Sequence, residues 1–142
     1  MNRLWRSPAP CAYVLALLFA APSLAAAETM NFEEAAAILG ASCGKDIDDN
    51  CRGVNLDPAR LKDCLLRNQD VVSAQCKAHY PRVFSAVQQR AAARAGVFKV
   101  CGRDAAKLCG SAEQPEVLQC LGSAKRGVSI QCGKTMTEAG YR

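Results

Sequence analysis

The sequence has 142 residues, of which 50% are apolar and 22% are charged, and its formal net charge is +5 at neutral pH. Basic and acidic residues are interspersed and form no basic stripe, which excludes the electrostatic footprint of a nucleic-acid-binding protein. The chain holds nine cysteines, so their placement bears directly on the fold and on the compartment.

The N-terminal segment, residues 1–27, has the three-part layout of a secretory signal peptide. Arg3 and Arg6 form a positive start, residues 11–21 are almost all apolar, and residues 25–27 are small alanines that suit cleavage. The apolar run is shorter than the ~20 residues that span a bilayer, and Pro22 ends it. We therefore expect cleavage after residue 27 and a periplasmic or secreted mature chain without a transmembrane segment.

A quartet of cysteines occurs twice in the remaining sequence. Cys43, Cys51, Cys64 and Cys76 return in the same order as Cys101, Cys109, Cys120 and Cys132, with equal spacing except for a slightly shorter middle loop in the second copy. Residues beside them return as well: Cys-Gly-Lys-Asp becomes Cys-Gly-Arg-Asp, and Cys-Leu and Val-Ser-x-Gln-Cys recur unchanged. Such a repeat predicts two copies of one small unit. We expect a signal peptide in residues 1–27, a first cysteine-rich repeat with an N-terminal helix in residues 28–80, a helical connector in 81–100 and a second repeat in 101–142.

The first repeat begins with helix signals. Asn31 and Glu34 have the spacing of a capping box, and the apolar residues from Phe32 to Leu39 share one helical face. Asp57 followed by Pro58 predicts the start of a second helix, because an acidic cap and a proline in the first turn both suit that position.

The remaining elements are also predicted to be helical. Ser73 is expected to cap a helix after a break near residues 68–70, and Ser129 is its counterpart. A longer helix should join the copies, with Pro81 either near its start or at a kink, and with a bend at Gly96. No alternating pattern of β-branched residues is present. The predicted fold is all-α, with two disulfide-stapled helical hairpin repeats joined by a longer helix.

Eight cysteines in a small exported chain indicate a disulfide framework. Cys43 and Cys51 would lie ~12 Å apart along one helix, whereas a disulfide needs Cα atoms within ~7 Å. A helical hairpin favours nested bonds in each quartet, which pair Cys43 with Cys76, Cys51 with Cys64, Cys101 with Cys132 and Cys109 with Cys120. The sequence by itself allows three pairings per quartet, so the other two stay open.

The order Cys-x-x-Asp, Cys, Cys-Leu and Val-Ser-x-x-Cys resembles the cysteine-rich repeat family. Such repeats occur in the Golgi glycoprotein that binds fibroblast growth factors and E-selectin, and in small exported bacterial proteins. The resemblance covers Cys43 to Tyr80 and Cys101 to Met136, although the second copy has a shorter loop and Gly122 in place of Leu66. It implies an exported helical disulfide module. Growth-factor or selectin binding is not carried over, since the animal protein has many more repeats and a membrane anchor.

The reactive side chains offer little support for catalysis. The cysteines lack the Cys-x-x-Cys spacing typical of zinc sites and of thiol–disulfide exchange, and His79 is the only histidine. We interpret Asp46 and Asp104 as surface charges or as hydrogen-bond acceptors that orient a turn. We expect no enzyme activity, cofactor or metal, and a binding or structural module of the cell envelope whose partner is an unknown protein or envelope component. The alternative is a thiol-based metal-binding protein, which would need reduced cysteines.

Overall fold

The computed structural model describes residues 28–142 apart from 55, 56, 111, 112 and 125, so the predicted signal peptide lies outside the described residues. The described ranges form five α-helices and no strand, which confirms the all-α class. In chain order these are α1 (Phe32–Asn50), α2 (Pro58–Arg67), α3 (Ala74–Leu108), α4 (Gln114–Ser123) and α5 (Ile130–Ala139). In this part of the chain no helix is both long enough and apolar enough to cross a lipid bilayer.

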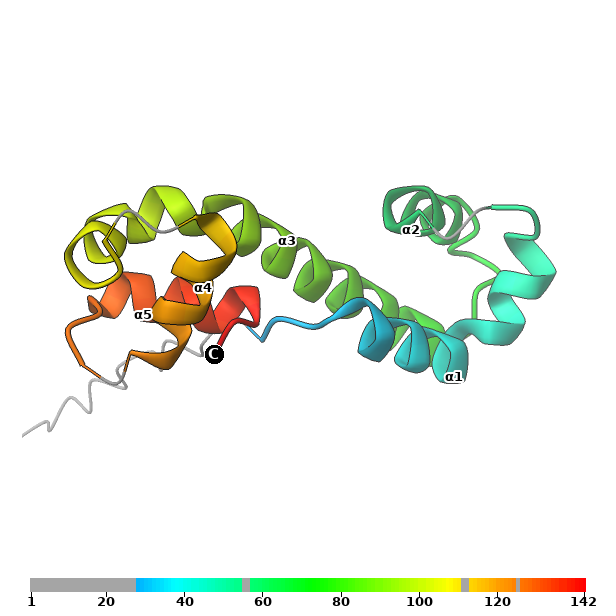
Figure 1. The fold of residues 1–142 in the computed structure, drawn as a ribbon. Helices are drawn as coiled ribbons and strands as arrows, with labels where there is room; N and C mark the ends of the chain where they lie inside the picture. Colours follow the sequence, from blue (N-terminus) through cyan, green and yellow to red (C-terminus); the bar gives the residue numbers. More distant parts are fainter. Residues whose placement is uncertain (1–27, 55–56, 111–112, 125) are drawn as a thin grey trace, which may run out of the picture.

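The long helix α3 organises the molecule, because the other helices lie against its two halves (Figure 1). α1 and α2 pack on its first half around a buried cluster that includes Leu39, Leu65 and Phe84. α4 and α5 pack on its second half around Val97, Leu121 and Met136. We call α1, α2 and the first half of α3, with their buried cluster, the first lobe. The second half of α3 with α4 and α5, and their buried cluster, is the second lobe.

The predicted helix starts are present in the structure. The Asn31 side chain accepts from the backbone N–H of Glu34 at 2.8 Å, and the Glu34 carboxylate accepts from the backbone N–H of Asn31 at 3.0 Å, which completes the capping box. Asp57 caps α2 in front of Pro58, and Ser73 caps α3. Short polar side chains thus satisfy backbone donors that have no partner within the helix.

The helix that was expected to join the two repeats continues through Gly96 without a break. α3 is assigned as a single helix of 35 residues that includes both Pro81 and Gly96. Pro81 lacks the N–H that would bond to residue 77, and a glycine inside a helix costs about 1 kcal/mol. Buried side chains on either side, Phe84 and Val97 among them, pack into the two lobes and offset these local costs. Residues 81–100 are therefore the middle of a helix that continues into both lobes.

Candidate functional site

Four disulfide bonds staple the helices to one another. Cys43–Cys76 joins α1 to α3 and Cys101–Cys132 joins α3 to α5, with Cα atoms 4.6 and 4.9 Å apart. Cys51–Cys64 joins the end of α1 to α2 and Cys109–Cys120 joins the end of α3 to α4, with Cα atoms 5.9 and 6.0 Å apart. The structure thus has the nested pairing in both quartets. All eight cysteine sulfurs of the described residues are in disulfides, whereas a thiol-based metal site would need thiolates.

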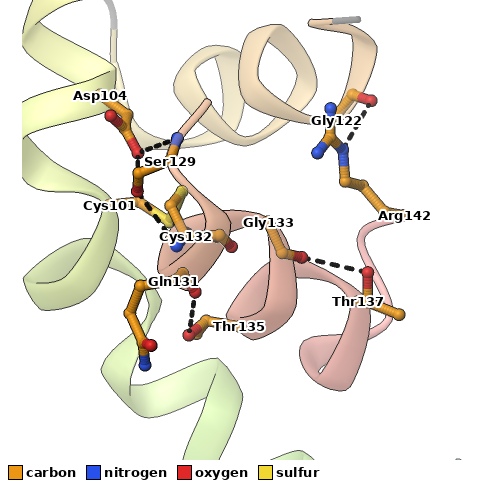
Figure 2. The surroundings of a disulfide bond; sticks show 10 residues. All are labelled: Cys101, Asp104, Gly122, Ser129, Gln131, Cys132, Gly133, Thr135, Thr137 and Arg142. Carbon is orange, nitrogen blue, oxygen red and sulfur yellow. Dashed lines mark hydrogen bonds between the residues drawn. A yellow bond between two sulfur atoms is a disulfide. The ribbon is translucent and has the colours of Figure 1, made fainter. Parts of the chain in front are cut away.

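An aspartate and a serine form a hydrogen-bonded clasp beside each helix-to-helix disulfide. Asp46 accepts from the backbone N–H of Ser73 at 2.8 Å and from its hydroxyl at 2.6 Å. Asp104 accepts from the same two groups of Ser129 at 3.0 and 2.6 Å, one turn from Cys101 (Figure 2). Each aspartate orients the turn before a helix, so the structural interpretation of these residues agrees with the contacts.

The clasp lowers the pKa of both aspartates. The largest cause is the hydrogen bond from the serine hydroxyl, followed by the bond from the serine backbone N–H. Because each hydrogen bond favours the ionised carboxylate, protonation must break or weaken the clasp. Both carboxylates are close to solvent, so the energetic effect is a modest one.

We expect stability to decline in acid through these two groups. A carboxylate whose pKa is lowered by folding stabilises the protein above its unfolded-state pKa, usually near 3.8, and this contribution is lost as the pH falls through the folded-state pKa. Replacing Asp46 and Asp104 by asparagine should flatten the fall in stability below about pH 4. Urea unfolding from pH 2 to 7 measures this, with Asp48→Asn, which changes an exposed aspartate of α1, as the control. An unchanged pH profile in the double variant would contradict it.

An apolar pocket of about 160 Å³ opens in the first lobe between α1, the start of α2 and α3. Phe32 stands at its rim with 55% of its surface exposed, whereas Leu61 and Phe84 are buried in its wall. No lining residue has a polar side chain. The full lining is Phe32, Ala35, Ala36, Leu39, Gly40, Ile47, Pro58, Leu61, Val83, Phe84 and Val87.

Two arginines of α3 reach the end of α5 in the second lobe. Arg94 Nε donates to the carbonyl of Ala139 at 2.9 Å, and its guanidinium lies 5.6 Å from the centre of the Tyr141 ring. The Arg90 guanidinium lies against Gly140, whose φ of +77° ends α5. Positive charge suits the carbonyl end of a helix. Arg94 thus attaches the end of α5 to the middle of α3, and Arg90 lies beside the same end.

The other residues considered for chemistry do not come together. His79 is exposed on α3, and Ser73 and Ser129 are helix caps whose hydroxyls bond to aspartates. Among the described residues, no three histidine, cysteine or acidic side chains are grouped so that they could hold a metal ion. The pocket is therefore the feature best suited to bind another molecule.

The apolar face from Phe32 to Leu39 was expected to serve helix packing, and the sequence did not predict the pocket. The predicted repeat contained a sign of the pocket. When Cys43 is aligned with Cys101, Gly40 corresponds to Phe98, so the predicted first copy lacks a large side chain that the predicted second copy carries. Comparisons with known protein families, with characterised proteins and with solved structures found no match for the chain.

Proposed function

We propose that the chain consists of two copies of one disulfide-stapled helical hairpin unit and acts as a non-enzymatic binding module. The helix bounds support the repeat. When Cys64 is aligned with Cys120, α4 begins and ends at the positions that correspond to the two ends of α2. In the same alignment the first residue of α5 corresponds to the first residue of α3. The aspartate–serine clasp and the two kinds of disulfide recur at matching positions.

The proposed location is the periplasm or the outside of the cell. Four disulfides support it, because such bonds persist in oxidising compartments and are rare where thioredoxin and glutathione keep thiols reduced. The signal-peptide layout of residues 1–27 supports it independently. The resemblance to the cysteine-rich repeat family agrees with an exported module and leaves the ligand open.

The apolar pocket carries the binding proposal. A cavity of about 150 Å³ lined by aliphatic and aromatic side chains binds benzene, and this pocket has a comparable volume and lining. It would receive one apolar group, either a small ligand or a side chain of an envelope partner. The wall offers no nucleophile, acid or base, which favours binding without chemistry.

The two copies have different residues at positions that line the pocket. Gly40 lines it, and no atom lies within 4 Å of the position that a Cβ would take there. Its counterpart Phe98 packs against the buried cluster of the second lobe. Phe84, in the pocket wall, corresponds to Gly140 when Cys76 is aligned with Cys132. At these two positions the second copy lacks the residues that line the pocket, so the pocket does not follow from the hairpin unit alone.

Replacing Gly40 by phenylalanine tests the proposal by installing the residue of the second copy. The phenyl ring should occupy the pocket while the helix is retained, because phenylalanine has a higher helix propensity than glycine. Benzene titrated into the mature protein should shift the NMR methyl signals of Leu39, Leu61 and Val83. We expect Gly40→Phe to weaken this binding by about tenfold or more.

The matched control is Gly102→Phe, which places the same side chain on an exposed face of α3 with open space around it. It should bind benzene like the unmodified protein. Methyl shifts that persist unchanged in Gly40→Phe, or that never appear at the pocket residues, would rule out the pocket as the binding site. Circular dichroism of both variants checks that the helices are retained.

A further inference from the structure

The four disulfides differ in how well the surrounding side chains cover them. Cys43, Cys76, Cys101 and Cys132 are at most 1% exposed, and Cys51 and Cys64 are 2% and 4% exposed. Cys109 and Cys120 are both only partly buried. Cys109–Cys120 is therefore the bond whose two cysteines are the most exposed of the four pairs.

α4, which carries Cys120, is also held less firmly at its start than its counterpart α2. The Asp57 side chain accepts from the backbone N–H groups of Ala59 and Arg60 at 2.8 and 3.2 Å. Glu113, at the corresponding position before α4, makes no such capping bond. A missing cap leaves the first turn of a helix less stable.

The ends of the two helices are held by different side chains. After α2, the Asn68 side chain donates to the carbonyl of Cys64 at 2.9 Å and to the carbonyl of Asn50 at 3.5 Å, which ties α2 to the end of α1. Ala124 occupies the corresponding position after α4 and has no side-chain amide. The end of α4 is instead reached by the exposed Arg142, which donates to the carbonyl of Gly122 at 3.5 Å (Figure 2) and to the carbonyl of Ala124.

We propose that Cys109–Cys120 is a redox-modification site, which an external dithiol reduces while the other three bonds stay intact. One thiolate of the dithiol attacks a sulfur of the bond and forms a mixed disulfide with the protein. The second thiol of the dithiol then attacks the dithiol's own sulfur in this mixed disulfide and releases the reduced protein. The S–S bond of the protein is reduced by two electrons, the dithiol becomes a disulfide, and its two protons end on the thiols of Cys109 and Cys120. Reduction removes the covalent link between the end of α3 and α4.

The consequence is local to α4. Val117 and Leu121 are the only side chains of α4 that are buried, and both belong to the cluster that contains Met136. Once the bond is open, α4 is held by these two side chains, by the partly buried Leu118 and by the hydrogen bonds from Arg142. The buried Cys101–Cys132 bond still joins α3 to α5, so the rest of the second lobe stays folded.

The order of reduction tests the site, with Cys51–Cys64 as the matched control within the same chain. The oxidised mature protein is exposed to dithiothreitol under native conditions, samples are quenched with an alkylating reagent over time, and labelled cysteines are identified by peptide mapping. Cys109 and Cys120 should be labelled about tenfold or more faster than any other cysteine, because a buried bond must wait for local opening. Reduction of Cys51–Cys64 first, or of both at equal rates, would overturn the proposal.

Hydrogen exchange then tests what the reduction does. In the selectively reduced and alkylated protein, the backbone amides of α4 should exchange faster, while those of α1, α2 and α5 should keep their protection. The variant Cys109→Ala with Cys120→Ala should show the same pattern without any reductant. Unchanged exchange in α4, or loss of protection across the whole second lobe, would refute a local effect.

Discussion

Replacing both Cys43 and Cys76 by alanine is expected to lower the free energy of unfolding by about 4 kcal/mol. The bond joins residues 33 apart in sequence, and closing a loop of this size restricts the unfolded chain by roughly that amount. Both cysteines are fully buried between α1 and α3, so alanine also leaves unfilled space there. A loss of this size is a large fraction of the stability of a small protein.

Chemical unfolding of the oxidised protein and of the double variant measures this loss. The comparison variant removes Cys51 and Cys64, which are 13 residues apart, and it should lose about 3 kcal/mol. Removing only Cys43 is a poor test, because the remaining Cys76 can form a wrong disulfide. A loss below that of the comparison variant would show that Cys43–Cys76 does not hold α1 on α3.

Replacing Gly140 by alanine is expected to destabilise the second lobe by about 2 kcal/mol or more. Gly140 has a φ of +77° at the end of α5. That conformation destabilises an L residue with a side chain by about 1–2 kcal/mol. A Cβ there would also overlap the Arg90 guanidinium, which would have to move. The Nε of Arg90 is buried and has no hydrogen-bond partner among the described residues.

Thermal unfolding of Gly140→Ala measures the effect, and a double-mutant cycle with Arg90→Ala separates its two causes. If the overlap contributes, Gly140→Ala should cost less when Arg90 is already alanine. The matched control is Gly102→Ala in α3, which has open space around it and should raise stability by about 0.5–1 kcal/mol. Equal costs of Gly140→Ala in both backgrounds would leave backbone strain as the sole cause.

The elements that local chemistry controls could be predicted from the sequence. Asn31, Asp57 and Ser73 each bond to the backbone a few residues along the chain, so their capping role depends on no distant residue. The hairpin geometry favoured the nested disulfides because the rise of a helix limits which sulfurs can meet. The structure has this pairing in both quartets.

The continuity of α3 could not be predicted in this way. Pro81 and Gly96 are unfavourable inside a helix by any local rule. The helix nevertheless passes through both, since residues on either side are buried in two separate clusters. The free energy gained from these contacts depends on α1, α2, α4 and α5. It cannot be inferred from the sequence around Pro81 or Gly96.

By itself the sequence determined the helical class, the positions of the caps and the set of sulfurs that can pair, because each follows from short-range geometry. Only the tertiary structure decided that an apolar pocket opens beside Gly40, that Arg90 and Arg94 meet the end of α5, and that Cys109–Cys120 is less covered than its counterpart. Each of these depends on how side chains distant in sequence fill or leave space around one another. Packing of that kind is a property of the assembled helices and not of any one segment.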